Sequence, residues 1–165
     1  LQRSDREIDW VNQSEVELSV ANCQKVLVNV GSVGQPRDED PRAAYAICDT
    51  VAFRLFDRTP DRWSRPAVWA VSEALYVRRA AFALLWALAL HDKGAGEAEL
   101  HEGLRLAEGV ADDDRPHVQK AVSMAVRAIG QRRGQRQAAL DWAEQVEPLG
   151  RNAVRTAREV RKALA

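Results

Sequence analysis

The sequence contains no long apolar stretch. Its longest uninterrupted run, Ala80–Leu90, is shorter than the ~18–20 residues that a helix needs to cross a bilayer. The first five residues also lack the charged and then apolar order of a signal peptide. We therefore expect a protein that has no membrane partner and works in the cytoplasm.

Metal-binding and disulfide patterns are also missing. The chain of 165 residues has two cysteines, Cys23 and Cys48, and three histidines, none at the short spacings of a metal site. In a cytoplasmic protein such cysteines are normally reduced thiols. We expect neither a metal nor another cofactor.

Net charge is absent as well, because 24 basic residues balance 24 acidic ones. The distribution, however, is uneven. From His117 onward ten basic residues face four acidic ones, which gives +6, whereas acidic residues gather in residues 5–17, 38–40 and 112–114. A local basic field can bind nucleic acid in a neutral protein. The alternative is an ordinary solvated helix surface.

Two short segments near the start are typical of β-strands. Residues 15–20 alternate between polar and apolar side chains, residues 25–30 are rich in valine, and four residues connect them. Residues 31–41 then contain two glycines and two prolines, which forbid regular structure. We therefore predict a small β-hairpin and loop over residues 1–44.

After Asp49 the apolar period changes from two residues to 3.6. Proline near the predicted starts and glycine in the breaks delimit successive helices. They are predicted over Val51–Asp57, Pro66–Val71, Leu75–Leu90, Glu97–Glu108, Pro116–Arg132, Gln135–Glu147 and Arg151–Leu164. The fold should be mainly α, a HEAT-like helical repeat (an α-α superhelix) over residues 45–165 with the hairpin as an N-terminal appendage.

Three blocks, residues 45–63, 77–93 and 112–130, occur in the order found in the DNA alkylation repair family. Over residues 45–165 the chain resembles the C-terminal part of that family. The resemblance implies a solenoid of paired helices that holds duplex DNA in a basic groove, without regard to base sequence, and excises alkylated purines without a cofactor.

The resemblance also implies roles for single residues. Asp49 would be the catalytic carboxylate, which stabilises positive charge on the deoxyribose and orients water. Tyr45 and Met124 would contact the lesion, although the family usually has tryptophan at both places. A π-face on a cationic lesion is worth ~0.5–2 kcal/mol, which methionine lacks. The predicted DNA-backbone contacts are Arg79, Lys120, Arg127, Arg132 and Arg133.

Each of these assignments has a structural alternative. An acidic residue such as Asp49 near a helix start is often a cap or a solvated charge. Arg79 could form an ion pair with Glu73 or Asp92, and Met124 could belong to the core. For the whole chain, the alternative function is a non-enzymatic helical-repeat scaffold that binds DNA or protein.

The N-terminal segment carries a second resemblance. Residues 25–47 resemble the C-terminal strand and loop of calcineurin-like metallophosphoesterases, and residues 1–47 would be a remnant of that family. The metal ligands of such enzymes precede this segment and have no counterpart here. A metallophosphoesterase fragment is therefore the third and most distant functional hypothesis.

Overall fold

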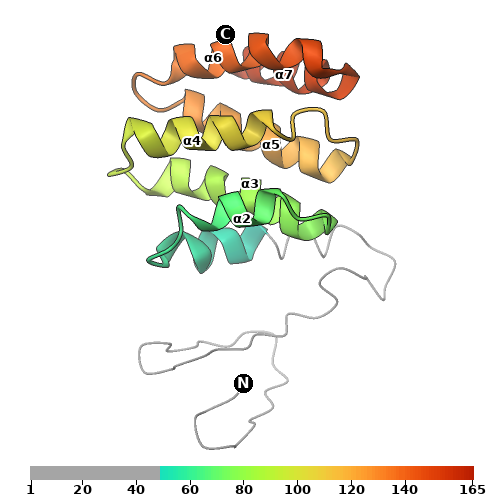
Figure 1. Ribbon diagram of the computed structural model, residues 1–165. Coiled ribbons are helices and arrows are strands. Elements are labelled where there is room, and N and C mark those ends of the chain that lie inside the picture. Colours follow the sequence, from blue (N-terminus) through green and yellow to red (C-terminus); the bar gives the residue numbers. More distant parts are fainter. Residues whose placement is uncertain (1–48) are drawn as a thin grey trace, which may run out of the picture. The chain divides into compact units, whose positions relative to one another are not determined.

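The computed structural model describes residues 49–165, and every regular element in this range is a helix (Figure 1). Residues 49–54 are helical. Eight further elements follow: the 3-10 turn η1 (Phe56–Arg58), α2 (Arg65–Ala70), α3 (Leu75–His91), α4 (Glu97–Glu108), α5 (Pro116–Gly130), α6 (Arg136–Val146), the 3-10 turn η2 (Glu147–Leu149) and α7 (Arg151–Leu164). The mainly α prediction is confirmed for these residues. The predicted hairpin and loop lie outside them.

The predicted helix bounds agree closely with the structure. α4 and α7 have the predicted limits, and α3 is one residue longer than expected. The largest departure is the segment 51–57, where the α-helix ends at residue 54 and η1 follows. Here the N–H and the hydroxyl of Thr59 both donate to the carbonyl of Phe56, which closes the chain into a tighter turn.

Helices adjacent in sequence pack as pairs. α2 packs on α3, α4 on α5, and α6 on α7. The second members of the pairs also contact one another, since α3 packs along α5 and α5 along α7. Figure 1 shows the three pairs as successive layers. This order of contacts is the one expected for stacked helix pairs.

α3 is the most deeply buried helix. Its sequence is apolar on nearly all sides, and nine of its residues, from Arg79 to Ala89, are buried. A helix with this pattern is expected to be covered on most of its sides. Accordingly, α3 contacts α2, α5 and η1. A second buried cluster, formed by Ala52, Ala83, Leu84 and Leu88, joins it to the helix of residues 49–54.

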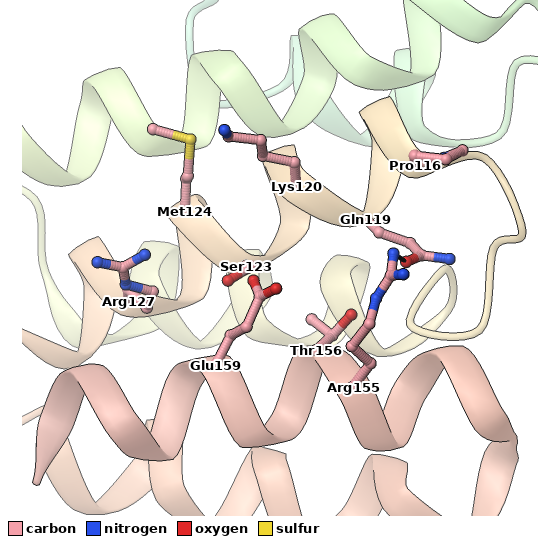
Figure 2. A pocket seen from close by; sticks show the side chains of 9 residues that line it. All are labelled: Pro116, Gln119, Lys120, Ser123, Met124, Arg127, Arg155, Thr156 and Glu159. Atoms are coloured by element: carbon pink, nitrogen blue, oxygen red, sulfur yellow. Dashed lines mark hydrogen bonds between the residues drawn. The ribbon is translucent and has the colours of Figure 1, made fainter.

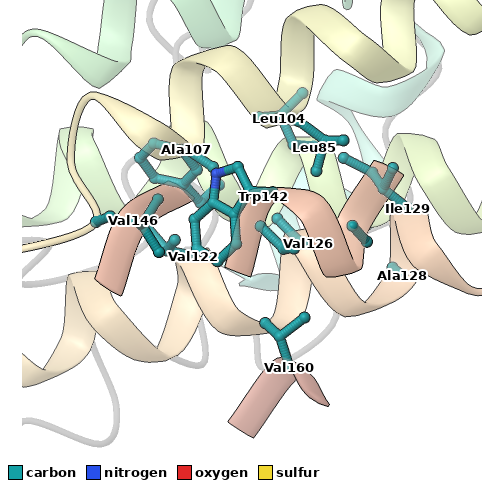
Figure 3. Packing of buried hydrophobic residues seen from close by; sticks show 14 of the residues in the cluster. Leu85, Leu104, Ala107, Val122, Val126, Ala128, Ile129, Trp142, Val146 and Val160 are labelled. Carbon is teal, nitrogen blue, oxygen red and sulfur yellow. The ribbon is translucent and has the colours of Figure 1, made fainter. Parts of the chain in front are cut away.

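The main core lies between the pairs. Trp142 of α6 is 2% exposed and packs in one cluster with Leu104 of α4 and Val122 of α5 (Figure 3). Burying one such aliphatic side chain contributes ~1.5–3 kcal/mol. The packing is close where α5 ends: a Cβ on Gly130 would lie 2.6 Å from Leu164 Cδ1 and 2.8 Å from Ala139 Cβ.

The loop between α4 and α5 fixes the start of α7. Asp112 Oδ1 accepts hydrogen bonds from the backbone N–H groups of Asn152 (2.9 Å) and Ala153 (3.2 Å). These are N–H groups of the first turn, which have no partner within the helix. Gly150 lies directly beneath the carboxylate, and a Cβ there would collide with it. The Asp112 carboxylate, from a distant part of the chain, thus caps the N-terminus of α7 in addition to the N-cap residue Gly150.

None of the helices within residues 49–165 combines the length and the apolar character that a membrane crossing requires.

Asp112→Ala should lower the free energy of unfolding by about 1 kcal/mol, because two N–H groups lose their acceptor. Gly150→Ala should cost a similar amount by displacing the same carboxylate. The double variant should cost less than the sum of the two, since each change removes one cap. Urea denaturation of the four proteins measures this coupling. Asp114→Ala, at an exposed acid in the same loop, is the control, and full additivity would contradict the assignment.

Candidate functional site

Asp49 and Arg79 form a buried ion pair. Arg79 Nη2 donates to both carboxylate oxygens of Asp49, at 2.8 Å to Oδ1 and 2.7 Å to Oδ2. The Arg79 side chain is 1% exposed and that of Asp49 is 20% exposed. The carboxylate therefore has a fixed orientation and retains some access to solvent.

Arg79 also connects Asp49 to a third helix. Its Nη1 donates to the backbone carbonyl of His117, at 2.8 Å, in the first turn of α5. The guanidinium thus joins the helix that carries Asp49, α3 and α5. The alternative partners are engaged elsewhere: Glu73 pairs with Arg78 at 3.1 Å, and Asp92 pairs with Arg62 at 3.0 Å.

The surroundings of Asp49 have opposing effects on its acidity. Burial raises the pKa of this carboxyl above its usual range, while the charge and hydrogen bonds of Arg79 and the charge of Lys120 act in the opposite direction. Burial is the strongest of these effects. The result is a carboxylate that is held by cations and is nevertheless more basic than an ordinary aspartate.

A polar pocket of about 370 Å³ lies between α5 and α7. Figure 2 shows side chains from both helices pointing into the space between them. Its lining consists of Pro116, Gln119, Lys120, Ser123, Met124, Arg127, Arg155, Thr156 and Glu159. Three of the residues predicted from the sequence, Lys120, Met124 and Arg127, therefore share one pocket. Met124 is half-buried on its wall and is absent from the buried core.

The predicted DNA-backbone contacts differ in position. Lys120 and Arg133 are exposed, and Arg127 is half-buried. Arg132 binds the C-terminal end of α3, where its guanidinium donates to the carbonyls of Asp92 (3.0 Å) and Lys93 (3.3 Å). Arg79 is enclosed by the ion pair described above. The geometry thus engages Arg79 and Arg132 inside the fold and leaves the other three on the surface or in the pocket.

Sequence reasoning missed part of the pocket. Ser123, Arg155, Thr156 and Glu159 were not singled out, although the last three lie on one side of a strongly amphipathic helix. The spacing of Ser123 and Arg127 puts them on one face of α5, but nothing local marks Ser123 as unusual. Tyr45 lies outside the residues that the structure describes.

Within residues 49–165, no group of three or more His, Cys, Asp or Glu side chains is arranged to hold a metal ion.

Comparison with known proteins finds one family for this chain. A family model described as DNA alkylation repair enzyme matches residues 42–160. This range contains Asp49, Arg79 and the α5–α7 pocket. No curated protein and no solved structure matches the chain. Nothing in the comparisons supports the metallophosphoesterase resemblance of residues 1–47.

Arg79→Lys should lower the free energy of unfolding by about 1–3 kcal/mol. A lysine ammonium cannot hold both oxygens of Asp49 and the His117 carbonyl in the same planar geometry. Urea denaturation measures the change, with Arg105→Lys, at an exposed arginine of α4, as the control. Equal stability of Arg79→Lys and the wild type would argue against the three-way contact.

Proposed function

Because the chain belongs to the DNA alkylation repair enzyme family, we propose that it recognises an alkylated purine in duplex DNA and hydrolyses its N-glycosidic bond. One observation carries this proposal beyond the family assignment. The carboxylate of Asp49 is held through both oxygens by a buried arginine and keeps partial access to solvent. A fixed, accessible carboxylate suits a reaction in which positive charge develops on a sugar.

The chemistry requires little of the protein. A purine alkylated at a ring nitrogen is cationic, so it leaves with the electrons of the glycosidic bond as a neutral base. Positive charge then develops at C1′ of the deoxyribose, where the negative charge of Asp49 stabilises it. The water oxygen forms the new bond to C1′, and the proton released from the water passes to Asp49. Arg79 is a positioning residue that orients the carboxylate.

We propose that DNA binds along the face formed by α3, α5 and α7, the inner face of a helical-repeat superhelix. Lys120, Arg127 and Arg133 would contact backbone phosphates, which carry no base sequence. Lys120 is close enough for its charge to lower the pKa of Asp49, which supports a backbone contact next to the reacting sugar. We leave Arg79 and Arg132 out of this set, because the fold already engages their guanidinium groups.

Met124 favours a second candidate function. From the pocket wall, Met124 would contact a lesion, but methionine lacks the π-face that stabilises a cation. A chain that binds DNA through the same face but lacks excision, a non-enzymatic scaffold, is therefore the alternative.

Asp49→Asn should lower the rate of purine release at least ~100-fold, because the amide cannot stabilise the positive sugar. It should leave the affinity for undamaged duplex DNA nearly unchanged, since Asp49 is not one of the residues that we expect to contact phosphates. Release of a methylated purine from alkylated duplex under single-turnover conditions measures the first quantity, and fluorescence anisotropy the second. Asp141→Asn, at an exposed acid on α6, is the control. Salt-sensitive DNA binding without any release by the wild type would favour the scaffold.

The rate of release should depend on pH through Asp49. The carboxylate is the active form, so the rate should fall as the pH drops through the pKa of Asp49, which burial places above that of an ordinary aspartate. Lys120→Gln removes a positive charge that lowers this pKa. Its acid limb should therefore lie at higher pH than that of the wild type.

Single-turnover rates between acid and neutral pH, corrected for spontaneous depurination, test this prediction. Circular dichroism at each pH confirms that the protein remains folded. Arg133→Gln serves as the matched control, because it also removes a cation but leaves the acid limb in place. An acid limb at or below that of an ordinary aspartate would contradict the proposed role of Asp49.

A further inference from the structure

Two hydrogen-bond donors in the α5–α7 pocket have no partner among residues 49–165. Ser123 is 1% exposed, and its hydroxyl forms no hydrogen bond within this range. The buried Nε of Arg127 is likewise unpartnered there. The two residues are four positions apart on α5, so they lie on one face of the helix, and both line the pocket.

The other buried polar groups of the pocket are satisfied. Gln119 Nε2 donates to the carbonyl of Asp113 at 2.6 Å, and its Oε1 accepts from Arg155. The hydroxyl of Thr156 donates to the carbonyl of Asn152 at 3.1 Å. A buried donor without an acceptor is unfavourable and uncommon in native proteins. Among the described residues that line the pocket, the buried donors without an acceptor are therefore those of Ser123 and Arg127.

The charges of the pocket favour an anion. Lys120, Arg127 and Arg155 contribute three positive charges and Glu159 one negative charge, which leaves +2. An anionic oxygen can accept from a hydroxyl and a guanidinium N–H at the same time. The geometry and the charge both point to a phosphate group.

Glu159 is the one acid among the described residues that line the pocket. It is exposed, and it forms no hydrogen bond or ion pair with any residue in the described range. Figure 2 shows its side chain extending from α7 toward Ser123 on α5. Its carboxylate accepts hydrogen bonds as a phosphate does. A rotation of the Glu159 side chain would let this carboxylate compete with a phosphate for the donors of Ser123 and Arg127.

We propose that the α5–α7 pocket binds one backbone phosphate of DNA through Ser123 and Arg127, and that Glu159 is an internal anion that competes with this phosphate. This inference rests on the proposed function, since the phosphate is that of the bound duplex. Ser123 and Arg127 would donate to one phosphate oxygen, and the Ser123 donor is a neutral hydroxyl. The acidic residue Glu159 would then lower the affinity for DNA. Undamaged DNA would then have to compete with Glu159 for these donors, whereas a lesion held at Asp49 supplies additional binding energy.

The test measures affinity for undamaged duplex DNA by fluorescence anisotropy and stability by thermal unfolding. Ser123→Ala should weaken binding about tenfold, the worth of one hydrogen bond to a charged group. Its melting temperature should stay equal or rise, because an unsatisfied buried hydroxyl has been removed. A purely structural serine would lose stability instead. Arg127→Lys keeps the charge but loses the Nε donor, and it should also weaken binding.

Glu159→Gln should tighten binding more than Glu144→Gln, a matched change at an exposed acid of α6 outside the pocket. The gain should shrink when Ser123→Ala is added, because the two residues act on the same phosphate. Equal gains for Glu159→Gln and Glu144→Gln would show a general charge effect and overturn the proposal.

Inorganic phosphate tests the source of the anion. The proposal expects millimolar phosphate to compete weakly with DNA in the wild type and less in Ser123→Ala. If phosphate stabilises the wild type but Ser123→Ala leaves DNA affinity unchanged, the pocket takes a free anion and the DNA proposal is wrong. If the wild type binds no DNA at all, the proposed function itself fails. Normal DNA binding and excision with no effect of the pocket variants would reject only the phosphate site.

Discussion

The buried guanidinium of Arg79 is the constraint on which the site depends. A cation that is 1% exposed is costly unless its donors meet well-placed acceptors. Here the acceptors are the carboxylate of Asp49 and a backbone carbonyl of α5. The same group that orients the candidate catalytic carboxylate therefore joins three helices, and the site cannot loosen without a loss of packing between them.

The arginines within residues 49–165 differ in the acceptors to which they donate hydrogen bonds. Arg132 and Arg136 donate to carbonyls at the C-terminal ends of α3 and α7, where the helix dipole is negative. Arg115 binds Asp113 and holds the pKa of that carboxyl well below its usual range. Such residues stabilise the fold, so the formal charge of the C-terminal third overstates the field available to DNA. In the proposed function, the part of this charge that meets DNA lies around Lys120, Arg127 and Arg133.

α5 separates two different environments. On the side of α4 and α6 its valines pack in the apolar cluster around Trp142. On the side of α7 it presents Ser123 and Arg127 to a polar pocket. A helix pair that needed only stability would fill this space with apolar side chains. The buried hydroxyl and guanidinium N–H, which meet no acceptor in the described part of the chain, are therefore the feature of this face that calls for a ligand.

The positions of the helices could be predicted from the sequence, because apolar periodicity, proline and glycine act over a few residues. Three blocks that resemble the family also led to predicted roles for Asp49, Arg79 and Met124. The sequence suggested Glu73 or Asp92 as the ion-pair partner of Arg79 and did not indicate Asp49, and it did not show that Arg132 binds the end of α3. Nor could it bring Glu159 to the same pocket as Ser123. Those contacts join residues distant in the chain, and only the packing of one helix pair on the next decides them.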